Sequence, residues 1–475
     1  MSHCRTMSDN ASTTIIAPLD AVNLRAQGLL RQSSSSESPR LHKRRLNRSS
    51  DEENHHIPLQ IPQGSSAMEG AFVTIPKALI SRQTLIHVGL SPSMADEIWG
   101  RWTDWPVDGP RREVDADDGG LQVTFFDFLV GRATGGSKPD TTGEGDTEWY
   151  ECLDACGIAP DTQAAIMDPN FTILRLSRSC LDWVRDTIEM RYAGLQDIQR
   201  ASRQREMELG RGASRPGSST GGSSAGAGRG DGGRRSISGL QQQGMASMAA
   251  DVWEPARAAA ARNAPGFTVL YKGIDQGRIS SLFGEDGTLS DIDALLSSPL
   301  LDFSGRSPLF YFTPDVKVAE YYAAYAKRCT TCESVVMVVL RIPNAAIEGL
   351  AEPDIQRLHW PSSAWKQMIW HGRNGKRLPK HLRVYKDAIL TIGSISRKPN
   401  HVYGRLAAPE DITEDFVLKL GADGQPASGG SIATQFVISG EEEGFEWLTE
   451  NGGKDIQVFP YPQAELARLV SANRP

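Results

Sequence analysis

The 475-residue chain has no apolar run long enough to cross a bilayer, and its first residues lack the charged-then-apolar pattern of a secretory signal. It has few cysteines, six in all, and of these only Cys329 and Cys332 stand at CxxC spacing. A structural zinc site needs four ligands, and no second CxxC or histidine pair stands at a usual distance. We therefore expect an intracellular protein with reduced cysteines, no metal site and no membrane contact.

An excess of positive charge is also missing. Acidic residues outnumber basic ones by 58 to 51, which gives a formal net charge of −7 and argues against a general nucleic-acid binder. A local basic patch exists at residues 366–386, where lysines and arginines stand beside tryptophans, an arrangement that can bind phosphates or single-stranded nucleic acid. The spacing of Trp365 and Ile369 favours instead a helix with a buried aromatic face and a solvated basic face. Nucleic acid is therefore not the favoured partner.

Two stretches have the composition of flexible chain. Residues 1–68 are rich in Ser, Arg, Asn and Gln without helical or strand periodicity, which predicts a disordered tail. Within this tail, the basic cluster at 42–48 is equally typical of a nuclear import signal and of a solvated charge run, so both a cytoplasmic and a nuclear location stay open. Residues 206–250 are dominated by Gly, Ser and Arg and are predicted to form a linker.

Residues 70–205 are predicted to form a mainly helical module. Ser91 and Pro92 are suited to begin a helix over 91–99, and 149–156 is also helical in pattern. Residues 180–203 carry apolar side chains at three- and four-residue steps, which indicates a long amphipathic helix. Residues 171–176 are strand-like. The tryptophans of this module are expected to lie in a hydrophobic core. Its sequence contains no recognisable set of catalytic residues, so we expect a packing or interaction module of unknown role.

Residues 252–472 form the second predicted module. β-branched and aromatic runs at 267–273, 335–342, 388–395 and 434–439 indicate strands, and 445–448 is helical in pattern. Many strands with few, non-alternating helices are typical of an α+β domain.

The stretch 309–326 lies at the centre of this module. Leu309–Phe312 has the length and residue types of a buried strand. Thr313 is a favourable N-cap for the helix that follows, Pro314 suits its first position, and Asp315 complements the helix dipole. The expected apolar stripe of this helix is formed by Val316, Ala319, Tyr322, Ala323 and Ala326.

Three pieces of this module, taken together, resemble the ADP-ribosyltransferase fold, in particular its poly(ADP-ribose) polymerase-like branch and related small bacterial and fungal domains. Residues 270–273 stand where the branch has a strand that ends in His-Gly. The Phe310–Phe312 run is followed by Tyr322 at the spacing that the branch uses, and 434–438 stand in place of its late Asn-Glu-Tyr-Ile-Val strand. Residues 302–305 look like an Asp-Phe-Gly turn. The resemblance covers about residues 267–448 and implies a split β-sheet.

The resemblance also implies NAD as substrate. Cleavage of the glycosidic bond of NAD gives a ribose centre with oxocarbenium character, which needs an anchor for the ribose, an aromatic face for nicotinamide and a carboxylate at the reacting centre. By position, Lys272 would be the anchor and Tyr322, with Tyr311 nearby, the stacking face, while Gln435 would stand at the reacting centre. Gly273 and Thr313 complete the predicted NAD-binding set, and Gln435 and Tyr322 are the predicted catalytic positions.

Two departures from the family pattern weaken the prediction of catalysis. Lys272 replaces the family's His, and a lysine still donates to a hydroxyl or phosphate. Gln435 replaces the family's Glu, and an amide cannot supply negative charge, a loss that typically costs about 100- to 1,000-fold in rate. We therefore expect an NAD- or ADP-ribose-binding protein that is weakly active or inactive as a mono-ADP-ribosyltransferase toward an unidentified protein target. The alternative is a non-catalytic interaction scaffold made of the two modules.

Overall fold

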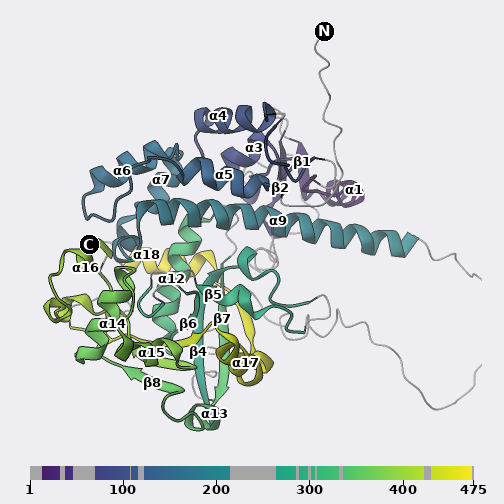
Figure 1. Cartoon of the computed structure of the whole chain (residues 1–475). Coiled ribbons are helices and arrows are strands. Elements are labelled where there is room, and N and C mark those ends of the chain that lie inside the picture. Colours follow the sequence, from purple (N-terminus) through teal and green to yellow (C-terminus); the bar gives the residue numbers. More distant parts are fainter. Residues whose placement is uncertain are drawn as a thin grey trace, which may run out of the picture.

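The computed structural model describes residues 13–32, 38–46, 70–106, 108–115, 122–213, 264–284, 288–297, 301–304, 307–330, 335–398, 400–421 and 429–472. Helices and strands are both abundant in these residues, as the sequence predicts. Figure 1 shows the short N-terminal helices on one side of one long helix, α9, and the larger β-sheets with their own helices on its other side.

The N-terminal residues form an ordered arm rather than a disordered tail, which corrects the prediction for residues 13–32 and 38–46. The arm contains helix α1 (Pro18–Ala26) and strands β1 (Leu30–Gln32) and β2 (Pro39–His42), and β3 (Phe72–Thr74) completes an antiparallel three-stranded sheet. The rest of the predicted tail, residues 1–12, 33–37 and 47–68, lies outside the described residues.

Contacts with a distant part of the chain hold this arm. The buried carboxylate of Asp20 accepts hydrogen bonds from Ser202 Oγ at 2.6 Å and from Arg205 Nη2 at 2.8 Å, both on α9. Ser202 Oγ also accepts from the Ala17 backbone N–H at 2.9 Å. The composition of the arm does not reveal partners that lie more than 180 positions away in the sequence. The sequence alone therefore predicts a disordered tail here. His42 and Arg44 of the basic cluster are buried here, which removes two of its side chains from the surface.

The helical module is formed as predicted, with one exception. Ser91 Oγ caps α4 by accepting from the Met94 N–H, and Pro92 is the first helical residue. Residues 171–176, predicted as a strand, are helical, because Asp168 caps a 3-10 turn and Phe171 packs against Tyr321 and Tyr325. The helices are α3 (Arg82–His87), α4 (Pro92–Thr103), α5 (Phe125–Thr134), α6 (Asp146–Ala155), α7 (Pro160–Ile166), α8 (Thr172–Arg175) and α9 (Cys180–Ala213).

Helix α9 is longer than predicted and is shared by both modules. It runs through residues 206–213, which the sequence assigns to the linker, while the linker's remaining residues 214–250 lie outside the described ranges. One continuous hydrophobic core contains Trp102 and Trp149 of the helical module together with Tyr321 and Tyr325 of α12 (Val316–Cys329). Tyr325 Oη donates to the Ile166 carbonyl at 3.1 Å across this boundary. The two modules therefore pack as one body.

The second module contains two sheets. Three antiparallel strands follow the order β13-β7-β4, and five strands follow the order β5-β6-β12-β9-β8, in which only β8 and β9 are parallel. The strands are β4 (Phe267–Asp275), β5 (Leu296–Ser297), β6 (Leu309–Phe312), β7 (Val335–Pro343), β8 (Ile355–Leu358), β9 (Leu390–Ser394), β12 (Thr434–Ser439) and β13 (Gln457–Pro460). A separate pair is formed by β10 (Lys419–Leu420) and β11 (Ser431–Ile432).

A single bridge joins the two larger sheets. Tyr271 on β4 and Thr313, just beyond β6, exchange backbone hydrogen bonds of 2.8 and 3.0 Å. On either side of this bridge β4 and β6 diverge, and α12 crosses the β4 face. The remaining helices are α13 (Asn344–Glu348), α14 (Ser363–Arg373), α15 (Arg383–Asp387), α16 (Asn400–Arg405), α17 (Glu442–Asn451) and α18 (Gln463–Ala472).

The start of α12 differs in detail from the prediction. Its N-cap is Asp315, whose carboxylate accepts from the Lys317 N–H at 3.0 Å, so the helix begins at Val316. Thr313, the predicted cap, instead donates its hydroxyl to the Thr434 carbonyl at 2.8 Å and accepts from the Asp315 N–H at 3.1 Å. The Thr313 side chain thus links the end of β6 to β12 and does not cap the helix.

Candidate functional site

A cavity of about 270 Å³ opens where the two sheets diverge, and its walls come from β4, β6, α12, β12 and α9. All six residues that the sequence predicts for the site line this one cavity: Lys272, Gly273, Tyr311, Thr313, Tyr322 and Gln435. These residues span more than 160 positions of the chain. Figure 1 shows β4, β6 and α12 adjacent to one another beneath α9.

Lys272 supplies a cation to the cavity. Its ammonium donates to the Leu295 carbonyl at 2.8 Å and to Ser297 Oγ at 2.7 Å, and it lies 5.7 Å from the centre of the Phe312 ring. None of these partners carries a negative charge. Burial and the positive charge of Arg278 together lower the pKa of Lys272 to about 7. The ammonium is therefore held in place by neutral acceptors, and no carboxylate of the described residues lies at salt-bridge distance from it.

The α9 wall brings charged residues that sequence reasoning missed. Arg278 donates to Asp186 Oδ1 of α9 at 2.8 Å, and Arg178 donates to the same oxygen at 3.2 Å. Burial alone would raise the pKa of Asp186, but these two arginines outweigh it and lower the pKa. Asp275, at the end of β4, is only 2% exposed, and burial raises its pKa to about 7 against the opposing charge of Arg278.

Two tyrosines face the cavity in different ways. Tyr322, predicted to belong to the buried stripe of α12 as well as to the site, is 39% exposed, whereas its neighbour Tyr321 is buried. Its ring is therefore accessible for stacking. Tyr311 is less free, because its hydroxyl oxygen accepts a hydrogen bond from the Phe303 backbone N–H at 3.0 Å. Desolvation of the hydroxyl groups and the charge of Asp302 raise the pKa of both phenols, that of Tyr322 to about 12, so both stay protonated at neutral pH.

Gln435 is part of a buried polar network centred on Asp302. Its amide Nε2 donates to Asp302 Oδ2 at 2.9 Å and to the Ser394 carbonyl at 3.2 Å. Arg373 binds Asp302 Oδ1 through Nε at 2.8 Å and Nη2 at 2.6 Å. Ser396 donates to the same carboxylate through its backbone N–H at 2.8 Å and its hydroxyl at 2.5 Å. Both charged side chains are nearly fully buried. Burial alone would lower the pKa of Arg373, but the charge and hydrogen bond of Asp302, together with Tyr403 and Tyr322, raise it overall.

Gly273 and Thr313 shape the cavity without offering it a free polar group. A Cβ at Gly273 would lie 2.5 Å from the Ala319 carbonyl oxygen and 2.7 Å from the Ala323 nitrogen, so only glycine allows α12 to lie this close to β4. The Thr313 hydroxyl hydrogen goes to the Thr434 carbonyl. Both residues thus have structural reasons to be present.

The arrangement favours binding over bond cleavage. Asp302 is neutralised by Arg373, and Asp186 by Arg178 and Arg278, so neither carboxylate is left to stabilise a developing positive charge. Burial weakens the third cavity carboxylate, Asp275, as an anion by raising its pKa to about 7. Lys272 is the cation of the site that has only neutral partners, and Tyr322 offers an exposed aromatic face. These features suit an anionic ligand that carries an aromatic ring.

Some site residues that the sequence does not assign nevertheless lie in recognisable sequence patterns. Asp302 belongs to the 302–305 turn, whose resemblance to an Asp-Phe-Gly turn implies no role for its carboxylate. Arg373 was counted in the basic patch, yet it is buried and points inward. Lys366 and Lys376 of that patch lie over the rings of Trp360 and Trp370, at 5.0 and 3.6 Å from the ring centres. No sequence pattern indicated that residues of α9 line the cavity, because their position there depends on how the two modules pack.

Cysteines and histidines form no further site in the part of the chain that is described. Cys152, Cys156, Cys180 and Cys329 are buried free thiols, and Cys332 lies outside the described residues. No group of three or more His, Cys, Asp or Glu side chains among the described residues is arranged to hold a metal ion. Nor does any described helix combine the length and apolarity needed to span a membrane.

Comparison of the chain with protein-family models, with curated proteins and with solved structures gives no match. The interpretation of the cavity consequently rests on its own geometry and on the sequence resemblance.

The Asp302–Arg373 pair generates a stability prediction. Either Arg373→Met or Asp302→Asn leaves one buried charge without its partner and is expected to reduce the free energy of unfolding by about 3–5 kcal/mol. The double variant removes both charges, so its loss of unfolding free energy is expected to be smaller than the sum of the losses of the two single variants. Chemical denaturation followed by tryptophan fluorescence measures these losses.

Arg82→Met is the matched control, because Arg82 pairs with Asp96 at the surface, where the side chains are 35% and 61% exposed. Loss of such an exposed pair is expected to cost less than about 1 kcal/mol. Equal, small losses for Arg373→Met and Arg82→Met would show that the buried network is not formed.

Proposed function

We propose that the cavity binds NAD or its ADP-ribose portion and that transfer of ADP-ribose is slow or absent. The observation that carries this proposal is the convergence of Lys272, Tyr322 and Gln435, which lie far apart in the sequence, on one cavity. The ADP-ribosyltransferase resemblance assigns these three positions to one NAD site, and their common cavity is what that assignment requires.

The polar groups of the cavity fit the parts of a dinucleotide. Lys272 can donate to a pyrophosphate oxygen or a ribose hydroxyl, and the exposed face of Tyr322 can stack on the nicotinamide ring. At about 270 Å³ the cavity lies just below the ~300–1,000 Å³ of typical small-molecule sites. The enclosed space therefore suits one half of the dinucleotide, with the other half at the open mouth.

The absence of fast transfer follows from the neighbours of Gln435. Its amide nitrogen is committed to Asp302 and to the Ser394 carbonyl, and an amide carries no negative charge. Asp302 is the nearest carboxylate of the network, and Arg373 neutralises it. The network around Gln435 can thus position a ribose, but it offers no unpaired carboxylate to stabilise an oxocarbenium-like transition state, and burial raises the pKa of the further cavity carboxylate, Asp275, to about 7.

The second candidate function is a non-catalytic interaction scaffold without a ligand in this cavity. The continuous core that joins the helical module to α12 favours it, because the two modules then present one rigid surface to a partner. NAD binding separates the two candidates, since the scaffold requires none.

Isothermal titration calorimetry with NAD and with ADP-ribose tests the proposal. The wild-type protein is expected to bind both at millimolar concentration or below, and Lys272→Ala to weaken binding by about 10- to 100-fold through loss of a charged hydrogen bond. Tyr322→Ala should weaken NAD binding by about 2- to 10-fold through loss of stacking. Release of nicotinamide, measured by chromatography over hours, should not exceed that of a protein-free control by more than a small factor.

Tyr150→Ala serves as the control for Tyr322→Ala, because Tyr150 is similarly exposed, at 43%, and does not line the cavity. Its affinity for NAD should equal that of the wild type. Absence of binding heat at millimolar NAD would leave the scaffold as the remaining candidate, and rapid nicotinamide release would contradict the predicted loss of catalysis.

The pKa values of Lys272 and Asp275, both shifted to about 7, predict how NAD affinity depends on pH. Between pH 6 and pH 8, Lys272 loses its positive charge and Asp275 gains a negative one. Both changes disfavour the anionic pyrophosphate, so affinity is expected to fall as the pH rises. Calorimetry at pH 6, 7 and 8 measures this dependence.

The double variant Lys272→Arg, Asp275→Asn carries charges that do not change in this range, because arginine stays protonated and asparagine stays neutral. Its NAD affinity should be nearly constant from pH 6 to pH 8. A wild-type affinity that rises with pH, or a double variant that retains the full wild-type slope, would refute the assignment of these two groups.

A further inference from the structure

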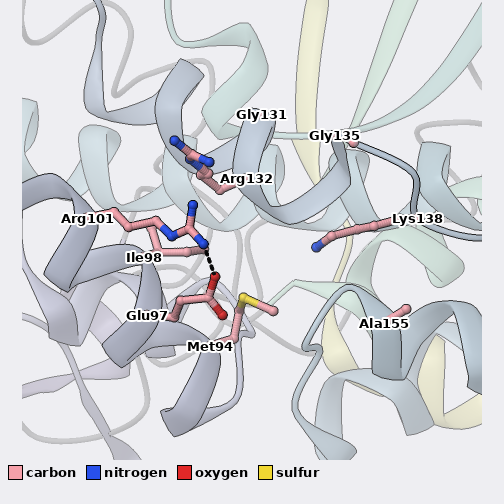
Figure 2. Close-up of a pocket in the computed structure, with 10 residues that line it drawn as sticks. Met94, Glu97, Ile98, Arg101, Gly131, Arg132, Gly135, Lys138 and Ala155 are labelled. Atoms are coloured by element: carbon pink, nitrogen blue, oxygen red, sulfur yellow. Dashed lines mark ion pairs between the residues drawn. The ribbon is translucent and has the colours of Figure 1, made fainter. Parts of the chain in front are cut away.

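A second cavity, of about 390 Å³, lies in the helical module, among α4, α5, α6 and the loop after α5. It shares no residue with the first cavity. Figure 2 shows Arg101 of α4 and Lys138 of the loop reaching into this space from opposite sides, with Arg132 of α5 near them. Three cationic side chains from three separate segments thus surround one cavity.

The charges around this cavity do not balance. Arg101 forms an ion pair with Glu97 at 3.0 Å, so these two side chains neutralise each other. For Arg132 and Lys138, no carboxylate lies at salt-bridge distance among the described residues. Two net positive charges are therefore left facing one space, in a protein whose overall formal charge is −7.

The known contacts of Arg132 and Lys138 leave donors for a ligand. Lys138 donates one hydrogen to the Ala133 carbonyl at 2.9 Å, near the C-terminus of α5, and an ammonium has three. The carbon of the Arg132 guanidinium lies over the Phe128 ring, 5.3 Å from its centre, and a guanidinium has five N–H donors. The hydrogen bond of Lys138 to the last turn of α5 explains part of the position of Lys138. It does not explain why Arg132 and Arg101 lie around the same cavity.

The shape of the cavity adds a second requirement. Its lining includes an apolar part, formed by Met94, Ile98 and Ala155, which we call the apolar floor. One wall contains Gly131, where an added Cβ would meet no atom within 4 Å, so the absent side chain leaves open space. A bare ion would not fill about 390 Å³ or use the apolar floor, whereas a small molecule with an apolar body would do both.

We propose that this second cavity binds a small phosphate monoester that carries an apolar or ring-shaped body. A phosphate monoester carries about −1.5 to −2 charges at pH 7 and three acceptor oxygens, which match the two unbalanced cations and their free donors. A carboxylate would leave about one positive charge unbalanced. This inference is independent of the NAD-binding proposal, because no residue is shared between the two cavities.

Calorimetry with phenyl phosphate, a phosphate monoester with an apolar ring, tests the inference on the full-length protein. The wild type should bind it at millimolar concentration or below, and at least about tenfold more tightly than inorganic phosphate or benzoate. Arg132→Ala should weaken binding by about tenfold or more through loss of a charged hydrogen bond. Lys272→Ala, a substitution in the first cavity, should leave the affinity for phenyl phosphate unchanged.

Gly131→Met provides a second variant that fills the cavity without removing a charge. Because Gly131 lies within α5 and faces open space, the substitution should not lower the unfolding temperature, and it should abolish phenyl phosphate binding. Gly100→Met is the matched control, since Gly100 also lies within a helix, also faces open space and does not line the cavity. Its affinity should equal that of the wild type.

Three results would overturn the inference. Absence of phenyl phosphate binding at several millimolar would exclude the site, and equal binding of inorganic phosphate would exclude a role for the apolar floor. Full binding by folded Gly131→Met protein would place the ligand elsewhere. The unfolding temperature of each variant shows whether it is folded.

Discussion

The buried carboxylate of Asp302 is the constraint on which the candidate site depends. It accepts hydrogen bonds from Arg373 at the end of α14, from Ser396 after β9 and from Gln435 on β12. Arg373 in turn donates to the Ser177 carbonyl at 3.0 Å, just before α9. A buried charge is tolerated only when it is paired and hydrogen-bonded, so these segments must keep their relative positions for the protein to be stable. The Asp302 network therefore fixes the relative positions of the segments that carry it, including the part of the cavity wall formed by β12.

The same network accounts for the residue at position 435. A glutamate there would place a second carboxylate about 3 Å from Asp302, where two negative charges repel and one must be protonated. Glutamine supplies instead the N–H that Asp302 Oδ2 accepts, at 2.9 Å. The departure from the ADP-ribosyltransferase pattern is thus matched by a carboxylate on a neighbouring segment. We infer that position 435 contributes to the shape and charge of a binding site rather than to bond cleavage.

Sequence patterns predicted what depends on local chemistry and missed what depends on distant contacts. The strands β4, β7, β9 and β12 follow β-branched and aromatic runs, and Ser91 and Pro92 begin α4 as expected. Residues 171–176 are helical despite their strand-like composition because Phe171 packs against α12, which lies 150 positions away. The N-terminal arm is ordered for the same kind of reason, through Asp20 and α9. The six predicted site residues reach one cavity. Asp186 had no pattern to mark it, since it meets Arg278, just after β4, only when the modules pack.

Hydrogen–deuterium exchange with and without NAD tests the central claim, that these distant segments form one dinucleotide site, most directly. Ligand contact slows backbone exchange by stabilising the segments that it touches. The account predicts that NAD slows exchange together in residues 270–275 of β4, 316–326 of α12 and 434–438 of β12, with no change in α4 and α5. Unchanged exchange in all three segments at saturating NAD, or slowing confined to the helical module, would contradict it.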